Sequence, residues 1–133
     1  MRANPHLIQK TVELMRQYGF AARLAPVPIV RVGKDRKASY EDGVIVLAKG
    51  SGDYDLVHEL VHHYQVDQGV PSYTLAHGEE YFKAWATEER ERQARIVSLA
   101  FIRPSWSMED VVRAVDQQTN AIVNGDYSSI TGE

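Results

Sequence analysis

The sequence predicts a small α+β domain in which short strands gather in the first half of the chain and helices make up the rest. Two runs rich in β-branched residues, at 29–32 and 44–47, have strand character, and segments with helical apolar spacing lie before and after them. The 133 residues, of which 44% are apolar, have the size and composition of one domain with a single core. We therefore expect one domain over residues 1–133 that ends in a tail at 124–133.

A helix followed by a strand is expected at the start of the chain. Asn4 is a good N-cap, Pro5 suits the first helical position, and apolar residues recur with roughly helical spacing until Gly19. These signals predict a helix over residues 5–18. A stretch with two prolines then leads into Ile29-Val30-Arg31-Val32, which predicts a short strand.

A turn, a second strand and a second helix follow. Tyr40-Glu41-Asp42-Gly43 is turn-like, and the short β-branched run Val44-Ile45-Val46-Leu47 predicts the strand. Gly50-Ser51-Gly52 ends that strand. Asp53 is the expected N-cap of a helix that continues to about residue 68.

Two further helices are expected in the second half of the chain. A long helix is predicted over residues 79–103, ended by Pro104. Ser107-Met108-Glu109-Asp110 has the spacing of a capping box and opens a last helix to about residue 123. The predicted order is a helix, a small sheet and then three helices.

Composition and charge exclude several classes of protein. The chain has no cysteine, so a disulfide framework, a thiolate metal site and a cysteine nucleophile are all excluded. A net charge of −3 without long blocks of either sign gives no sign of a nucleic-acid or membrane-surface partner. No apolar run approaches the roughly 20 residues that span a bilayer. We expect a cytoplasmic protein whose available metal ligands are histidine and carboxylate.

His58-Glu59-Leu60-Val61-His62 is an H-E-x-x-H motif inside the helix expected from Asp53. Histidines four residues apart lie on one helix face, so both imidazoles can bind a single zinc ion. Glu59 stands beside the first histidine and can act as general base on a water whose pKa zinc lowers. With five histidines in the chain, such a motif would arise by chance in roughly one shuffled sequence in a hundred. The motif therefore predicts zinc bound by His58 and His62, with Glu59 as the catalytic base.

A catalytic zinc site keeps three protein ligands, so a third ligand is expected later in the chain. The candidates are glutamates of the long helix: Glu79, Glu80, Glu88, Glu89 and Glu91. Glu91-Arg92-Gln93-Ala94 resembles the glutamate helix of gluzincins, in which the ligand glutamate is commonly followed three residues later by a small residue. The resemblance implies Glu91 as the third ligand, with Glu88, one turn earlier, as the alternative.

The resemblance extends to compact zinc metallopeptidases of the zincin clan, namely minigluzincins and phage-type anti-repressor metallopeptidases. It rests on the motif, on the separation of His62 from Glu91 and on the apolar run that ends at Pro104. It implies a minimal zincin-like domain with a small twisted sheet, an active-site helix, a long glutamate helix and a C-terminal helix. It also implies that an edge strand within residues 40–47 offers its backbone to an extended peptide or protein substrate.

One departure from the gluzincin pattern concerns the support of the zinc histidines. Many gluzincins carry Asp or Asn four residues after the ligand glutamate, where it hydrogen-bonds a zinc histidine, and this chain has Arg95. That support is expected to come from elsewhere or to be lost.

Three residues near the motif carry weaker signals. His63 points away from the expected metal position and is predicted to contact a metal ligand from behind or to be a polar core residue, and not to bind the metal. Tyr73 and His77 could stabilise the oxyanion of a tetrahedral intermediate, although a surface or packing role is the simpler interpretation.

The expected function is that of a gluzincin-type endopeptidase, in which zinc-activated water hydrolyses a peptide bond with Glu59 as base. The competing expectation is a zinc-binding regulatory or latent protein with little general proteolytic activity. In the latent form, residues 124–133, which include Asp126, would lie across the cleft.

Overall fold

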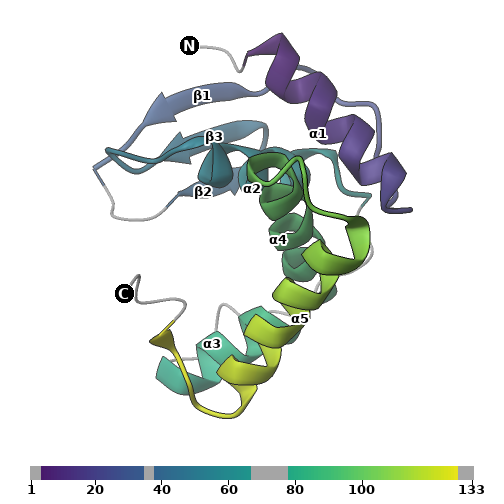
Figure 1. Cartoon of the computed structure of the whole chain (residues 1–133). Coiled ribbons are helices and arrows are strands. Elements are labelled where there is room, and N and C mark those ends of the chain that lie inside the picture. The colour runs from purple at the N-terminus through teal and green to yellow at the C-terminus, as the bar shows by residue number, and fades with distance from the viewer. Residues whose placement is uncertain (1–3, 35–37, 67–77, 129–133) are drawn as a thin grey trace.

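The computed structural model describes residues 4–34, 38–66 and 78–128 of the chain. Within these ranges the chain forms five helices and a three-stranded sheet, which confirms the predicted α+β class (Figure 1). In chain order the elements are α1 (Pro5–Gln17), β1 (Ile29–Val32), β2 (Ser39–Glu41), β3 (Val44–Leu47), α2 (Asp53–Tyr64), α3 (Gly78–Thr87), α4 (Glu89–Ile102) and α5 (Met108–Val123). None of the described helices is long and apolar enough to cross a membrane.

The sheet has the order β1-β3-β2, with β1 parallel and β2 antiparallel to β3. The predicted turn at residues 40–43 is therefore only half right, because Ser39–Glu41 is a strand. Asp42-Gly43 alone makes the turn, with φ values of 48° and 80° that suit a two-residue hairpin. An edge strand lies at the start of the expected segment 40–47, because within the described residues β2 is an edge of the sheet, whereas β3 pairs on both sides.

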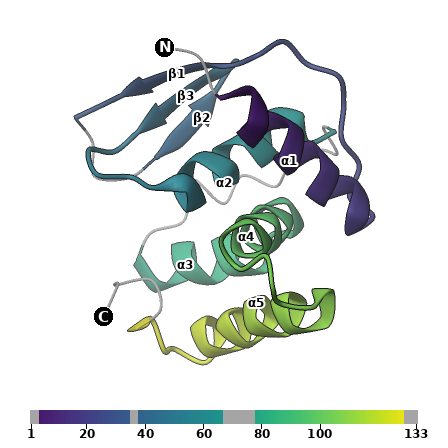
Figure 2. The ribbon, with the colours of Figure 1, turned by 45° about the horizontal axis from the view of Figure 1, so that its top comes forward.

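One row of the sheet faces the helices. Val30 and Tyr40 both lie in register with Ile45, so the three side chains share a face. Val30 and Ile45 are buried in a core that also includes Val57 and Leu60 of α2. Figure 2 shows the resulting order of layers: the sheet is uppermost, α1 and α2 lie beneath it, α3 and α4 follow, and α5 is outermost.

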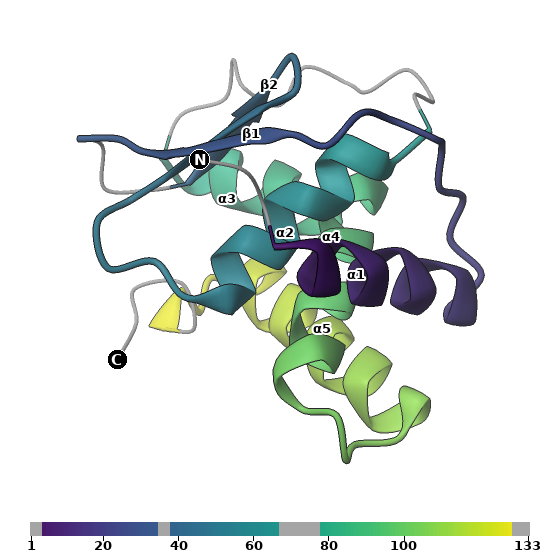
Figure 3. The ribbon, with the colours of Figure 1, turned by 90° about the horizontal axis from the view of Figure 1, so that it is seen from above.

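Helix α2 is the centre of this arrangement, because it packs against the sheet on one side and against α4 on the other. Ala94 of α4 is fully buried, and its small side chain suits a close approach of two helices. Figure 3 shows α1 next to α2, and α1 also contacts α4. The helix that carries the motif is thus held from three sides.

The single long helix predicted over residues 79–103 is wrong, because the chain breaks at Glu88. This residue is extended, with φ −74° and ψ 127°, and its side chain caps α4 by accepting a hydrogen bond from the Glu91 N–H. The break ends α3 at Thr87, whose hydroxyl donates back to the Lys83 carbonyl. Glutamate is not among the strong N-cap residues, so the sequence did not predict a helix break at this position.

The helix ends differ in smaller ways from their predicted positions. The N-cap of α2 is Gly52, so Asp53 is the first helical residue, where its charge favours the helix dipole. This helix ends at Tyr64 and not near residue 68. The predicted start of α5 is confirmed, since the Ser107 hydroxyl accepts a hydrogen bond from the Asp110 N–H.

A chain of hydrogen bonds ties the β2–β3 hairpin to α2 through His63. The Gly43 N–H donates to the Tyr40 hydroxyl at 3.0 Å, and that hydroxyl lies 2.8 Å from Nδ1 of His63. Nε2 of His63 lies 2.6 Å from the Pro26 carbonyl, which can only accept, so Nε2 donates and Nδ1 accepts from Tyr40. His63 is buried with both nitrogens engaged, which agrees with its prediction as a polar core residue.

The Tyr40→Phe variant is expected to be destabilised by about 1–3 kcal/mol, because the buried Nδ1 of His63 and the Gly43 N–H both lose a partner. Urea unfolding followed by circular dichroism measures the change. Tyr18→Phe is the matched control, since no hydrogen bond of the Tyr18 hydroxyl is found in the described part of the chain. Equal unfolding midpoints for the two variants would contradict the role of the network.

Candidate metal centre

His58 and His62 lie one turn apart on the face of α2 that meets α4. Their rings are arranged edge to face with centroids 5.0 Å apart. Glu91, in the first turn of α4, faces both of them. The three side chains are largely shielded from solvent, with exposed fractions of 13% for His58, 12% for His62 and 8% for Glu91. The packing of α2 on α4 thus brings Glu91 next to His58 and His62, which lie 33 and 29 positions before it in the chain.

Two histidine nitrogens converge on one carboxylate. Nε2 of His58 lies 2.9 Å from Oε2 of Glu91, and Nε2 of His62 lies 3.1 Å from Oε1 of the same residue. His58, Glu59 and His62 also form a cluster whose potential ligand atoms all lie within 4.8 Å of one another. The structure therefore has a group of side chains that can hold a metal ion, as the motif predicted.

Glu59 is buried beside the two histidines. Burial raises the pKa of its carboxyl, and the neighbouring His58 and His62 counteract only part of that effect. A carboxylate with a raised pKa is a better proton acceptor near neutral pH than an exposed one. Glu59 is thus a buried carboxyl group with a raised pKa, next to the two histidines.

Glu91 and His62 shift each other's pKa in opposite directions. Burial acts to raise the pKa of the Glu91 carboxyl, but hydrogen bonds from His58 and His62 hold it well below its usual range. Burial acts to lower the pKa of His62, and the hydrogen bond and charge of Glu91 outweigh it, so this pKa is raised. In the metal-free protein, Glu91 is therefore a carboxylate that favours the protonated form of His62.

The metal-free protein is expected to lose the stability contributed by Glu91 on acidification. A carboxyl whose pKa is lowered by folding stabilises the protein fully above its ordinary pKa of about 4.3, and that contribution falls below this pH. The raised pKa of His62 has the opposite sign, so its contribution is present below about pH 6.5 and is lost as the pH rises through the folded-state pKa.

Urea unfolding in the presence of a chelator tests this pH dependence. The difference in unfolding free energy between wild type and Glu91→Gln is expected to shrink between about pH 5.5 and about pH 3.5, by at most about 1.4 kcal/mol per pH unit below 4.3. A difference that is unchanged or larger at the lower pH would show that Glu91 is not held as a carboxylate.

Gln65 contacts the site through His62, and the sequence did not predict this contact. Its Oε1 lies 2.9 Å from Nδ1 of His62, on the side of the ring opposite Glu91. Gln65 is the C-cap of α2, three residues after His62. That spacing is the only signal of this contact in the sequence, and it is a weak one.

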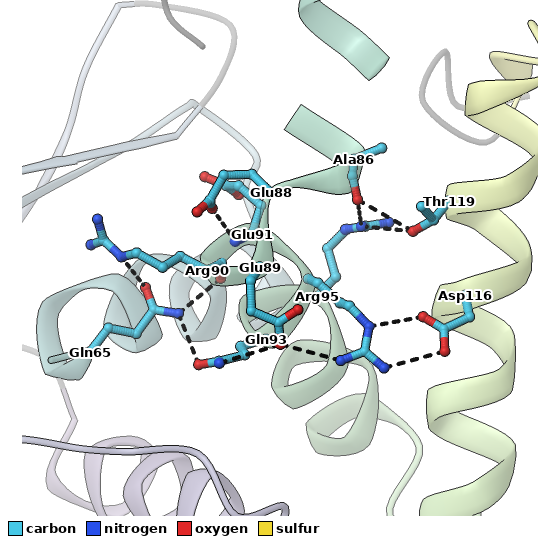
Figure 4. A network of polar contacts seen from close by, with 11 residues as sticks. Gln65, Ala86, Glu88, Glu89, Arg90, Glu91, Gln93, Arg95, Asp116 and Thr119 are labelled. Carbon is cyan, nitrogen blue, oxygen red and sulfur yellow. Dashed lines mark hydrogen bonds and ion pairs between the residues drawn. The ribbon is translucent and has the colours of Figure 1, made fainter. Parts of the chain in front are cut away.

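The other glutamates considered as third ligand have different partners. Glu88 caps α4 (Figure 4). Glu89 is exposed and pairs with Arg92. The side chains of Glu79 and Glu80 lie outside the described residues. Among the candidates whose side chains are described, Glu91 is the one that the structure brings to the two histidines.

Arg95 has no contact with the histidines and instead joins three helices. It is buried, and its guanidinium donates to the Ala86 carbonyl at the end of α3 and to Thr119 of α5 (Figure 4). It also donates to Gln118 of α5. Burial lowers the pKa of Arg95. Arg95 therefore has a structural role, joining α4 to α3 and α5.

The C-terminal segment is described as far as residue 128, and Asp126 does not reach the histidines. Asp126 is fully exposed and accepts two hydrogen bonds from Ser128, which hold the pKa of its carboxyl below the usual range. Tyr127 packs its ring against Phe82 of α3, with centroids 5.6 Å apart. Tyr73 and His77, considered for the oxyanion, lie outside the described residues.

Comparison of the chain with protein-family models, with curated proteins and with solved structures found no match. The interpretation of the site therefore depends on the residues and their geometry. These give an H-E-x-x-H motif on a helix, with His58, Glu59 and His62 close enough to hold one metal ion.

Proposed function

We propose that the chain is a zinc-dependent metallopeptidase of the gluzincin type, in which His58, His62 and Glu91 hold the zinc ion and Glu59 is the general base. The observation that carries the proposal is the convergence of two Nε2 atoms of α2 on the Glu91 carboxylate of α4. Two imidazoles and one carboxylate are the ligand set of catalytic zinc sites that keep one position open. The donor atoms present fit this metal.

A bound zinc ion would act as a Lewis acid on a peptide carbonyl and lower the pKa of a water molecule. The remaining steps belong to the chain itself. The Glu59 carboxylate accepts the proton of the attacking water and passes it to the amine that leaves when the peptide bond breaks. The largely buried histidines keep bulk water from the charged groups, which strengthens the interactions among them.

An extended substrate is proposed to pair with β2, which is an edge of the sheet and contacts α2. The Tyr40 side chain leaves this strand and hydrogen-bonds His63, the neighbour of His62. This hydrogen bond fixes the position of β2 relative to α2, the helix that carries the H-E-x-x-H motif. A peptide added to β2 would therefore run at a fixed distance from Glu59.

Incubation of the purified protein with a peptide library, followed by mass spectrometry, tests the proposed activity. Cleavage is expected with the zinc-loaded protein, is lost after chelation and returns when zinc is added. A zinc-loaded protein that cleaves no peptide would contradict the peptidase and favour a zinc-binding regulatory protein on the same scaffold.

A further inference from the structure

We propose that Gln65 is a positioning residue that fixes the ring of His62 so that Nε2 is presented to the metal. This inference rests on the proposed zinc site. It concerns a contact outside the H-E-x-x-H motif, made by the residue that ends α2.

The orientation of the Gln65 amide is determined by the start of α4. Its Nε2 donates to the Arg90 carbonyl at 2.8 Å, and its Oε1 accepts from Nε of Arg90 at 3.2 Å (Figure 4). A carbonyl only accepts and an arginine N–H only donates, so the reversed amide would lose both bonds. A third, longer contact of 3.4 Å joins Nε2 to Oε1 of Gln93.

This orientation fixes the role of each nitrogen of His62. Because Oε1 of Gln65 is an acceptor, Nδ1 of His62 must carry a proton and donate it. In the neutral ring the lone pair is then on Nε2, the atom that faces Glu91. Gln65 is 3% exposed, so water does not compete strongly for this hydrogen bond.

Gln65 thus supplies the support that Arg95 does not provide. A metal-bound histidine usually donates its other N–H to a carboxylate, a carbonyl or a water, which orients the ring, and loss of that partner typically weakens metal binding by about 10–100-fold. Here the acceptor is a neutral amide oxygen, held by Arg90 of the helix that also carries Glu91. The same two helices therefore fix both the ligand and its support.

Zinc affinity, measured by competition with a chelating dye, tests the role of Gln65 with two variants. Gln65→Leu removes both the acceptor for His62 and the donor to Arg90, and it is expected to weaken zinc binding by about 10–100-fold. Gln65→Glu keeps an acceptor and loses only the donor, so it is expected to bind zinc at least as tightly as wild type. Gln93→Leu is the control, because Gln93 belongs to the same network without contacting His62, and its affinity should equal that of wild type.

A second readout distinguishes positioning from general stability. In the zinc-loaded, 15N-labelled wild type, the Nδ1–H proton of His62 is expected to exchange slowly with water. In Gln65→Leu it is expected to exchange fast, while the signals of the His58 ring stay unchanged and report an intact site. This comparison remains valid if the variant is less stable, provided that circular dichroism shows it folded.

The possible outcomes separate this inference from the proposed function. A wild type that binds no zinc overturns both. Tight zinc binding by wild type and by Gln65→Leu alike overturns only the role of Gln65. Equal weakening in Gln65→Leu and Gln65→Glu shows that the bond to Arg90 matters and that the acceptor for His62 does not, which also overturns it.

Discussion

The Glu59→Gln variant is expected to bind zinc as wild type does and to hydrolyse peptides about 10²–10⁴-fold more slowly. Glutamine has nearly the same shape as glutamate, so the packing around the buried side chain and the positions of His58 and His62 are preserved. An amide oxygen, however, cannot take up the proton of the attacking water. The loss therefore falls on the chemical step and not on metal binding.

The measurement is kcat/KM for one peptide identified in the library, together with zinc content, for each protein. Glu89→Gln is the matched control, because Glu89 is an exposed glutamate whose described contacts are with Arg92 and Gln93. It should cleave at the wild-type rate. If Glu59→Gln cleaves as fast as wild type, Glu59 is not the base, or the activity belongs to a contaminant.

The Arg95→Met variant is expected to lose about 3 kcal/mol of unfolding free energy. Its guanidinium makes three hydrogen bonds, to Ala86, Gln118 and Thr119, and bonds to a charged group contribute about 1.5–3 kcal/mol each. Part of this sum is offset, because burying the charge costs free energy and Nε of Arg95 has no partner in the described residues. Methionine fills much of the volume but removes the 2.7 Å donor of the Ala86 carbonyl, which keeps only a longer contact of 3.4 Å with the Thr119 hydroxyl among the described residues.

Arg92→Met is the control for this prediction, because Arg92 also joins α4 to α5. Its pair with Asp116 is partly exposed, with 2.9 Å between Nε and Oδ1, and such pairs contribute about 0–1 kcal/mol. Urea unfolding of both variants gives the comparison. If the two variants are equally stable, Arg95 does not hold α3, α4 and α5 together.

Local signals predicted much of the fold because they act within a few residues. Asn4-Pro5 and Ser107 fixed helix starts that the structure confirms, and the β-branched runs gave β1 and β3 with the observed bounds. The short strand β2 was missed, because Ser39-Tyr40-Glu41 is half polar and is stabilised by pairing with β3. Its tie to α2 depends on His63, which is distant in sequence.

The candidate site was predicted in part for the same reason. The motif places His58, Glu59 and His62 on one helix face by spacing alone. The break at Glu88 was not predicted, because glutamate is not a strong N-cap residue. The contact of Gln65 with His62 was not predicted either, because the orientation of Gln65 depends on how α2 and α4 meet. Helix α4 is shorter than the helix expected over residues 79–103, and Glu91 lies in its first turn, directly after a cap made by Glu88.

The metal content of the purified protein tests the central claim most directly. After reconstitution with zinc and removal of the excess, elemental analysis of wild type is expected to give one zinc ion per chain. The His58→Ala/His62→Ala variant, shown to be folded by circular dichroism, is expected to give none. A folded wild type that retains no zinc, or a double variant that retains as much as wild type, would contradict the zinc centre at His58, His62 and Glu91.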